Sequence, residues 1–246
     1  YPPDSYWGTS NTGQINYNTY YSQYWNTSDL QVGGVMFTTV VHELGHALGL
    51  GHPHDNAYLF PGVSSWSDTG DNGLNRNLHT VMSYNDVGSF YSPDGLESYG
   101  FQTLGAFDIA AIQHLYGASS RNNGDDVYEI PTSNAAGTFY EAIWDTGGTD
   151  TISYAGSDTV TIDLHAATLD AADGRLAGGG ISKPTGIYGG FTIANGVVIE
   201  NAIAGSGDDI VRGNAADNIL DGGAGSDYLG YEYATGAVAV YLSRGY

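Results

Sequence analysis

The chain has 246 residues, 41% of them hydrophobic, which is enough for the core of one large domain or two smaller ones. It contains no cysteine, so disulfides are excluded and bound metal is the expected substitute for cross-links. The net charge of -21, from 27 acidic and 6 basic residues, repels nucleic acids and anionic membrane surfaces. No apolar run approaches the roughly 18 residues that span a bilayer. Neither nucleic acid nor membrane is therefore expected as a partner.

Helical and loop patterns dominate the first half of the chain. Residues 1–31 are predicted to be mostly loop, apart from a strand-like run at Gln14–Tyr17. Apolar residues at helical spacing predict a helix from about Val32 to Leu50, and the glycines around Leu50 are expected to end it. The polar residues 53–79 form a stretch too long for a simple connection, so we expect a functional loop. A second helix is predicted from Thr103 to Tyr116.

The pattern changes after the second predicted helix. From Asn122 onwards, short runs of Thr, Ile and Val alternate with Gly and Asp turns, which is typical of an all-β region. We expect the domain boundary near residues 117–120, so that the chain divides into residues 1–117 and 118–246.

Four of the seven histidines lie between Thr38 and Asp55. His42 and His46 are four residues apart, so on a helix their rings project from one face and can bind one ion together. His52 follows a glycine turn and can complete a site of three nitrogens, which with an open fourth position describes catalytic zinc. Glu43 lies beside the ion without having to bind it, as a general base would. The alternative is a set of helix-face histidines packed against the core.

The string HELGHALGLGHP, together with VMSY at Val81 to Tyr84, resembles the serralysin family of metzincin zinc endopeptidases. The resemblance implies that His42, His46 and His52 bind zinc and that Glu43 is the general base. It also implies that Tyr84 is a weak zinc ligand that swings away to stabilise the transition-state oxyanion, and that Met82 forms an apolar floor. The remaining histidines are predicted to lie on the surface or to be buried with hydrogen-bond partners; they are His54, His79, His114 and His165. Of these, only His54 is close enough to the zinc motif to line a substrate cleft.

Three segments of nine residues repeat from Ala204: AGSGDDIVR, GNAADNILD and GGAGSDYLG, which together span residues 204–230. They match the pattern G-G-x-G-x-D-x-U-x, in which each unit makes a turn and a short strand and calcium lies between stacked turns. The middle unit departs from this pattern, with Ala216 in place of glycine and Asn218 in place of aspartate. The predicted calcium ligands are carboxylates, an amide and glycine carbonyls: Asp209, Asp227, Asn218, Gly205, Gly207, Gly223 and Gly225. Ordinary Gly-Asp turns are the alternative.

The same resemblance implies calcium sites before the repeats, in NNGDDVY and WDTGGTD. One would use the carboxylates and carbonyls of Asp126, Asp145, Asp150, Asn122, Gly124, Gly147 and Gly148. A neighbouring ion would share Asp150 with Glu200 and the carbonyl of Val198.

The fold implied by the resemblance is an α+β metzincin-like protease domain followed by an all-β calcium-binding parallel β-roll or β-sandwich region. The implied function is a secreted, monomeric zinc endopeptidase with one zinc and several calcium ions. Protein substrates, a small proteinaceous inhibitor and bacterial type I export are further expectations. The family is longer at both ends, so we interpret the chain as an interior piece.

Two alternatives to this function remain. One is a non-catalytic calcium-ordered binding module, or an inactive fragment that retains the zinc site, and the other is a metal-dependent hydrolase of another bond. Glu43 favours the protease, because a purely structural zinc site needs no carboxylate there.

Overall fold

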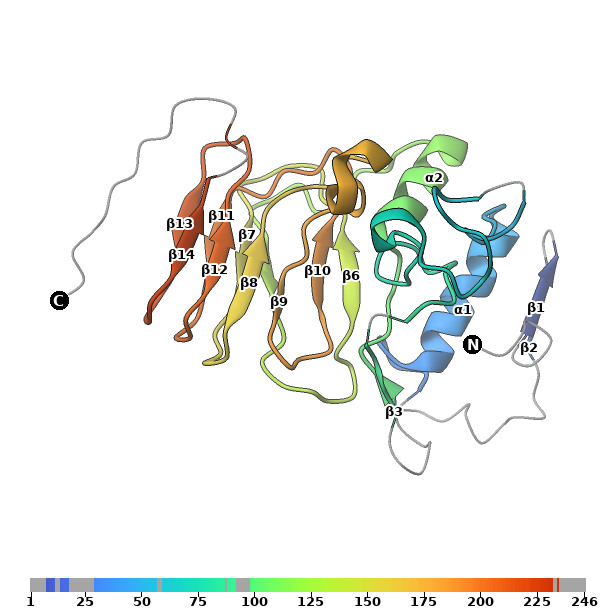
Figure 1. Ribbon diagram of the computed structural model, residues 1–246, viewed down its shortest axis with the longest axis horizontal. Helices are drawn as coiled ribbons and strands as arrows, with labels where there is room; N and C mark the ends of the chain where they lie inside the picture. Colours follow the sequence, from blue (N-terminus) through green and yellow to red (C-terminus); the bar gives the residue numbers. More distant parts are fainter. Residues whose placement is uncertain are drawn as a thin grey trace.

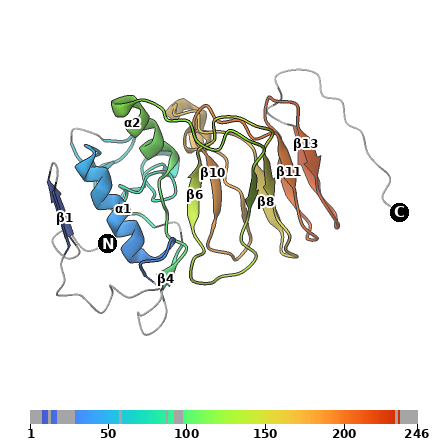
Figure 2. The same ribbon diagram turned by 180° about the vertical axis from the view of Figure 1, so that it is seen from behind.

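The computed structural model describes residues 8–11, 14–17, 29–56, 59–86, 88–91, 98–231 and 234. A part that contains the two long helices lies beside a part built of short stacked strands (Figure 1). The reverse view gives the same order along the long axis (Figure 2). An α+β part is therefore followed by an all-β part, as predicted. The loop expected for residues 1–31 lies largely outside the described residues.

Helix α1 (Val35–Ala47) lies beside a hairpin of two antiparallel strands, β1 (Gly8–Asn11) and β2 (Gln14–Tyr17). Strand β2 confirms the predicted run. The helix was expected to begin near Val32, but Gly33 has a φ of 85° and a Cβ there would lie 2.1 Å from the Thr138 carbonyl oxygen. This close approach of two backbones delays the start of the helix.

The chain between the helices contains little regular structure among its described residues. It includes a short 3-10 turn, η2 (Asp71–Gly73), and an antiparallel pair, β3 (Phe90–Tyr91) and β4 (Ser98–Tyr99). Helix α2 (Ala106–Tyr116) begins later than Thr103, because Gly105 is extended and packs on the His79 backbone. Among the described residues, no helix combines the length and the apolar character needed to cross a membrane.

The β-rich part consists mainly of parallel strands. Strands β6 (Tyr140–Ile143) and β10 (Gly190–Ile193) pair with each other. One four-stranded sheet has the order β13 (Ile219–Asp221), β11 (Asn201–Ile203), β7 (Thr151–Ser153), β5 (Val127–Glu129). The other has the order β14 (Tyr228–Gly230), β12 (Ile210–Arg212), β8 (Val160–Asp163), β9 (Lys183–Pro184), with β9 antiparallel to β8. A 3-10 segment, η3 (Ala171–Gly178), contacts η2.

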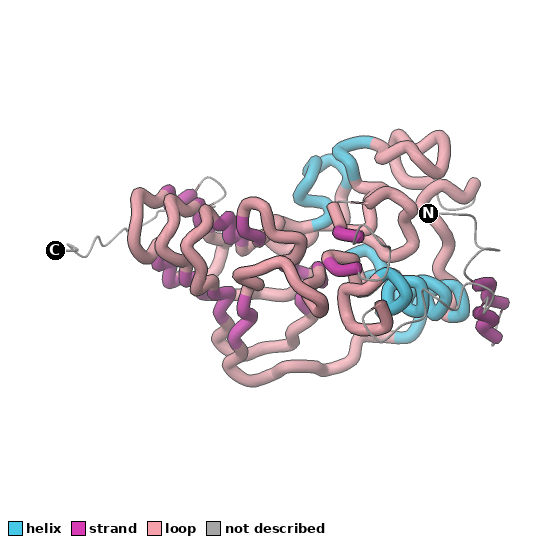
Figure 3. Tube along the Cα trace, turned by 90° about the horizontal axis from the view of Figure 1, so that it is seen from below, coloured by secondary structure: helices cyan, strands magenta, loops and turns pink. Residues whose placement is uncertain are grey.

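The strands of consecutive repeats belong to opposite sheets. In the paired registers Ala202 lies opposite Leu220 and Val211 opposite Leu229, so two units of nine residues complete one coil. The coils stack one after another toward the C-terminal end (Figure 3). Middle residues of the strands pack into the core: Ile152, Ile162 and Ala202 are fully buried, whereas Leu220 and Leu229 in the last repeats are partly buried. The predicted parallel β-roll is confirmed.

Candidate metal centres

Three histidine nitrogens converge at the C-terminal half of α1. His42 and His46 lie about one turn apart, and the turn at Gly49, with a φ of 97°, brings the chain back toward them. Nε2 of His52 lies 3.2 Å from Nε2 of His42 and 3.0 Å from Nε2 of His46. The structure therefore brings together the three residues predicted to bind zinc.

The other ring nitrogen of each α1 histidine faces a backbone carbonyl. Nδ1 of His42 lies 2.8 Å from the Val81 oxygen, and Nδ1 of His46 lies 2.9 Å from the Leu50 oxygen. Because a carbonyl only accepts, each Nδ1 carries the hydrogen and each Nε2 of the neutral ring presents a lone pair. Lone pairs this close repel one another unless a cation lies between them. The donor set thus fits a metal ion such as zinc.

A carboxylate three residues further along holds His52. Oδ2 of Asp55 accepts a hydrogen bond from the His52 backbone at 2.9 Å and lies 3.1 Å from Nδ1 of the same ring. Burial acts to raise the pKa of Asp55, but the hydrogen bonds from His52 and the charges on His52 and His54 outweigh it, so the pKa lies below its ordinary value. Asp55 was not among the predicted site residues, although an aspartate in a turn often accepts hydrogen bonds from nearby backbone.

Asp55→Ala is expected to weaken zinc binding by about 10-fold to 100-fold, because the group that orients His52 is lost. Competition with a chelating dye measures the affinity. Asp71→Ala is the matched control, since Asp71 is exposed in η2. Equal zinc affinities of the two variants would show that Asp55 does not orient a ligand.

Two more of the predicted site residues lie here. The Tyr84 hydroxyl is 2.9 Å from Nε2 of His52, and Glu43, the neighbour of His42 on α1, is only 2% exposed. The ring of His54 stacks 4.8 Å from that of His52 and lies 5.1 Å from that of Tyr84. His54 therefore belongs to this cluster, whereas the chemical roles of Glu43 and Tyr84 stay predictions.

Met82 packs against α1 at Gly45. It is 1% exposed, and a Cβ at Gly45 would lie 2.6 Å from its sulfur atom. Glycine at this helical position therefore lets the methionine approach the helix between the turns that carry His42 and His46. The predicted turn around Met82 thus lies against the histidine helix, and its neighbour Val81 fixes the His42 ring.

Asp108 on α2 anchors this turn. Its carboxylate accepts hydrogen bonds from the Thr80 hydroxyl at 2.6 Å, the Val81 backbone at 2.7 Å and the Gly105 backbone at 2.8 Å. Burial raises the pKa of Asp108 to about 6, although these three hydrogen bonds act to lower it. The bond to Gly105 caps α2, a pattern that an aspartate at the third helical position signals. The contact with residues 80 and 81 has no local signal in the sequence and was not predicted.

Asp108→Asn is expected to lower the free energy of unfolding by about 2 kcal/mol, because the amide group must face an N–H or O–H donor in a buried site. In a chain of this size that corresponds to a melting temperature lower by about 4–8 °C. Thermal unfolding at neutral pH measures it, with Asp217→Asn as the exposed control. A variant that melts with the control would contradict the anchoring role.

A cluster of carboxylates forms at the start of the β-rich part. Asp126, Asp145 and Asp150 each offer an oxygen, and these oxygens lie within 4.8 Å of one another. Asp150 is 1% exposed, and its Oδ2 is buried without a hydrogen-bond partner among the described residues. Burial, together with the charges of Asp145 and Glu200, raises the pKa of Asp150. A hard cation such as calcium would relieve this crowding.

The two predicted segments around this cluster lie against each other. A Cβ at Gly148 would lie 2.0 Å from the Gly124 carbonyl oxygen, so the two predicted segments touch. Glu200 reaches the cluster and accepts a hydrogen bond from the Asp150 backbone at 2.8 Å. The carbonyls predicted as ligands at Asn122, Gly147 and Val198 stay predictions.

The turns of the repeats stack as the period of nine predicts. Oδ1 of Asp227 accepts from the Asp209 backbone at 3.0 Å, and Cβ atoms at Gly223 and Gly225 would lie about 2 Å from the carbonyl oxygens of Gly205 and Gly207. Calcium binding by these residues stays a prediction.

Asn218, in the middle unit, forms hydrogen bonds of its own. Its amide donates to the Glu200 carbonyl oxygen and to the Asn214 side chain, and its oxygen accepts from the Asn214 backbone. The bond to Glu200 connects this turn to the preceding coil, and calcium binding by Asn218 stays a prediction.

Comparison with protein families identifies the family of this chain. Residues 106–240 match the family described as Peptidase M10 serralysin C terminal, which is more than half of the chain. The chain belongs to the serralysin family. Residues 2–77 match the Matrixin family, in agreement with the metzincin-like fold expected for the first part of this serralysin-family chain.

Individual relatives support the same family assignment. The chain is 35% identical over 236 residues to a serralysin of Proteus mirabilis, with 89% of this chain and 43% of the relative covered. It is 38% identical over 226 residues to serralysin C of Dickeya chrysanthemi (86% and 42% covered) and 34% identical over 197 residues to metallopeptidase AprA of Pseudomonas marginalis (74% and 38% covered). This serralysin-family chain thus spans about two fifths of the length of these relatives.

Proposed function

We propose that this chain is the metal-binding part of a zinc endopeptidase that hydrolyses protein substrates. The observation that carries the proposal is the meeting of three Nε2 atoms, from His42, His46 and His52, beside the buried Glu43. These three histidines would hold one zinc ion, with Tyr84 as a weaker fourth ligand. The names of the relatives, serralysin and metallopeptidase, support the same class of activity.

Zinc bound here would polarise the substrate carbonyl and lower the pKa of water toward ~7. Glu43 takes the proton from the attacking water and passes it to the leaving amine. Tyr84, whose hydroxyl lies 2.9 Å from His52, donates a hydrogen bond to the oxyanion as it forms. Val81, Leu50 and Asp55 keep the imidazole rings in one orientation through the reaction.

Several calcium ions would order the β-rich part. The carboxylates of Asp126, Asp145 and Asp150 support one site, Glu200 beside Asp150 supports its neighbour, and the stacked Asp209 and Asp227 support sites in the roll. We also propose that the boundary between the protease and calcium-binding domains lies near residues 117–120. Secretion, a monomeric state and a small proteinaceous inhibitor are proposed from the family alone.

Hydrolysis of denatured casein by the 246-residue chain in calcium-replete buffer tests the proposed activity. We expect cleavage that stops when zinc is chelated and returns when zinc is restored. A chain that binds one zinc ion but does not cleave casein would be a metal-loaded binding module instead, and the proposed activity would then be wrong for this chain.

A further inference from the structure

Asparagine is followed directly by glycine three times in this chain, at Asn72, Asn123 and Asn195. Such a pair loses the side-chain amide more readily than other asparagine pairs, because glycine has no Cβ to shield the backbone nitrogen that attacks the asparagine side chain. The reaction requires an asparagine side chain that can rotate and a glycine N–H that is not held in a hydrogen bond. The structure distinguishes the three pairs on both points.

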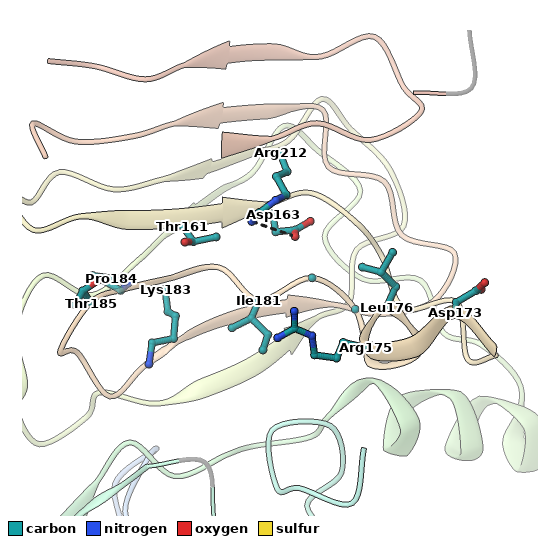
Figure 4. Close-up of a pocket in the computed structure, with 12 residues that line it drawn as sticks. Thr161, Asp163, Asp173, Arg175, Leu176, Ile181, Lys183, Pro184, Thr185 and Arg212 are labelled. Atoms are coloured by element: carbon teal, nitrogen blue, oxygen red, sulfur yellow. Dashed lines mark ion pairs between the residues drawn. The ribbon is translucent and has the colours of Figure 1, made fainter. Parts of the chain in front are cut away.

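The pair at Asn72 is held through its backbone. The N–H of Gly73 donates to the carbonyl oxygen three residues earlier at 3.2 Å. The Asn72 side chain also lies near η3, because a Cβ at Gly174 would be 3.7 Å from its Oδ1. Figure 4 draws Asp173 and Arg175, the residues on either side of that glycine. Attack by the Gly73 nitrogen therefore requires a hydrogen bond to break first.

The pair at Asn195 is held through its side chain. Nδ2 of Asn195 donates to the Ala167 carbonyl oxygen at 2.7 Å, although Asn195 and Gly196 are both exposed. Rotation of the side chain toward the Gly196 nitrogen breaks this bond. Attack is disfavoured here too, by about the worth of one hydrogen bond.

The pair at Asn123 is held in neither way. Asn123 and Gly124 are exposed and lie outside the helices and strands. Within the part of the chain that the structure describes, neither the Asn123 side chain nor the Gly124 N–H forms a hydrogen bond. A Cβ at Gly124 would meet nothing within 4 Å, so the space around the attacking nitrogen is open. The neighbouring Asn122 differs, because its Nδ2 donates to the Tyr128 hydroxyl at 3.1 Å and no glycine follows it.

We propose that Asn123 is a site of spontaneous deamidation at the edge of the carboxylate cluster of Asp126, Asp145 and Asp150. The Gly124 nitrogen forms a bond to Cγ of Asn123, the bond from Cγ to the amide nitrogen breaks, and the amide leaves as ammonia with the proton of the Gly124 N–H. Solvent water then opens the cyclic imide. Cleavage of the new bond gives aspartate, and cleavage of the original peptide bond gives isoaspartate. Either product carries a carboxylate in place of a neutral amide.

Calcium would control the rate, a step that rests on the proposed calcium site. The carbonyls of Asn122 and Gly124, both predicted ligands, flank Asn123, so a bound ion restricts the rotation that brings nitrogen and side chain together. Isoaspartate would in turn weaken the site. It lengthens the main chain where the Gly124 carbonyl oxygen lies 2.0 Å from the position of a Cβ at Gly148, so the close approach of the two segments is lost. Asn123 would thus record how long the chain has been without calcium.

Timed incubation of the full chain tests the proposal, with Glu43→Gln present so that no self-digestion interferes. Samples are kept in calcium-free buffer below the melting temperature in that buffer, and fragment-ion mass spectrometry measures the conversion of each asparagine. We expect Asn123 to convert about fivefold faster than Asn72 or Asn195, because a hydrogen bond must break first at those two sites. Conversion of Asn123 no faster than that of the other two would overturn the proposal.

Gly124→Ala is the matched variant. The added methyl group meets nothing within 4 Å, so the loop accommodates it, but the methyl group crowds the attacking nitrogen. Conversion of Asn123 should become about tenfold slower, with the rates at Asn72 and Asn195 unchanged. Equal conversion of Asn123 in the variant and its parent would overturn the proposed attack by the Gly124 nitrogen.

The same incubation with calcium separates the modification from the calcium site. Slower conversion at Asn123, with no change at Asn72, would support the control by calcium. Equally fast conversion of Asn123 with and without calcium would overturn that control, together with an ion held by the Asn122 and Gly124 carbonyls. The comparison among the three asparagines in calcium-free buffer would still support the deamidation site.

Discussion

Glu43→Gln is expected to reduce casein hydrolysis by about 10³-fold while the chain keeps one bound zinc ion. Glutamine has nearly the shape of glutamate, so the 2% exposed site beside His42 remains filled, but the amide cannot take a proton from water. The three histidines that would hold the metal are unchanged. Hydrolysis assays and the zinc content of the purified variant measure the two quantities on one sample.

Glu129→Gln is the matched control for this prediction, since Glu129 is exposed on β5 in the other part of the chain. It should hydrolyse casein at the wild-type rate. If Glu43→Gln kept activity within about tenfold of wild type, Glu43 would not be the general base. If it lost both zinc and activity, Glu43 would have a structural role in the metal site.

The features of the fold and of the metal site that could be predicted depend on residues close together in the sequence. The spacing of His42 and His46 fixes their rings on one face of any helix, and one glycine turn is enough to return His52. The strict period of nine likewise fixes the alternation of strands between two sheets. In each case geometry follows from local backbone structure alone, so the sequence is sufficient.

Contacts between distant segments explain what could not be predicted. Asp108 binds the backbone of Val81, and nothing near Asp108 in the sequence points to that partner. Gly33 delays α1 because the chain around Thr138 crosses it, which depends on the packing of the two parts.

Removal of calcium is expected to produce the largest loss of stability in this chain. Asp126, Asp145 and Asp150 hold oxygens within 4.8 Å of one another, and burial and the charges of the neighbouring carboxylates raise the pKa of Asp150. Without a cation, like charges repel in a site from which water is excluded. An ion at 100 times its dissociation constant contributes about 2.7 kcal/mol per site, so several sites together exceed the effect of most single substitutions.

Chelation with EGTA should therefore lower the melting temperature by about 5–10 °C for each site emptied. Thermal unfolding followed by circular dichroism in calcium and in EGTA measures the difference. Asp150→Asn should melt lower than wild type in calcium and respond less to EGTA, because it removes the carboxylate on which the charges of both Asp145 and Glu200 act. The exposed Asp217→Asn should respond as wild type does. Identical melting of the wild-type chain in calcium and EGTA would mean that packing of the roll, from Ile152 to Leu229, holds this part together without ions.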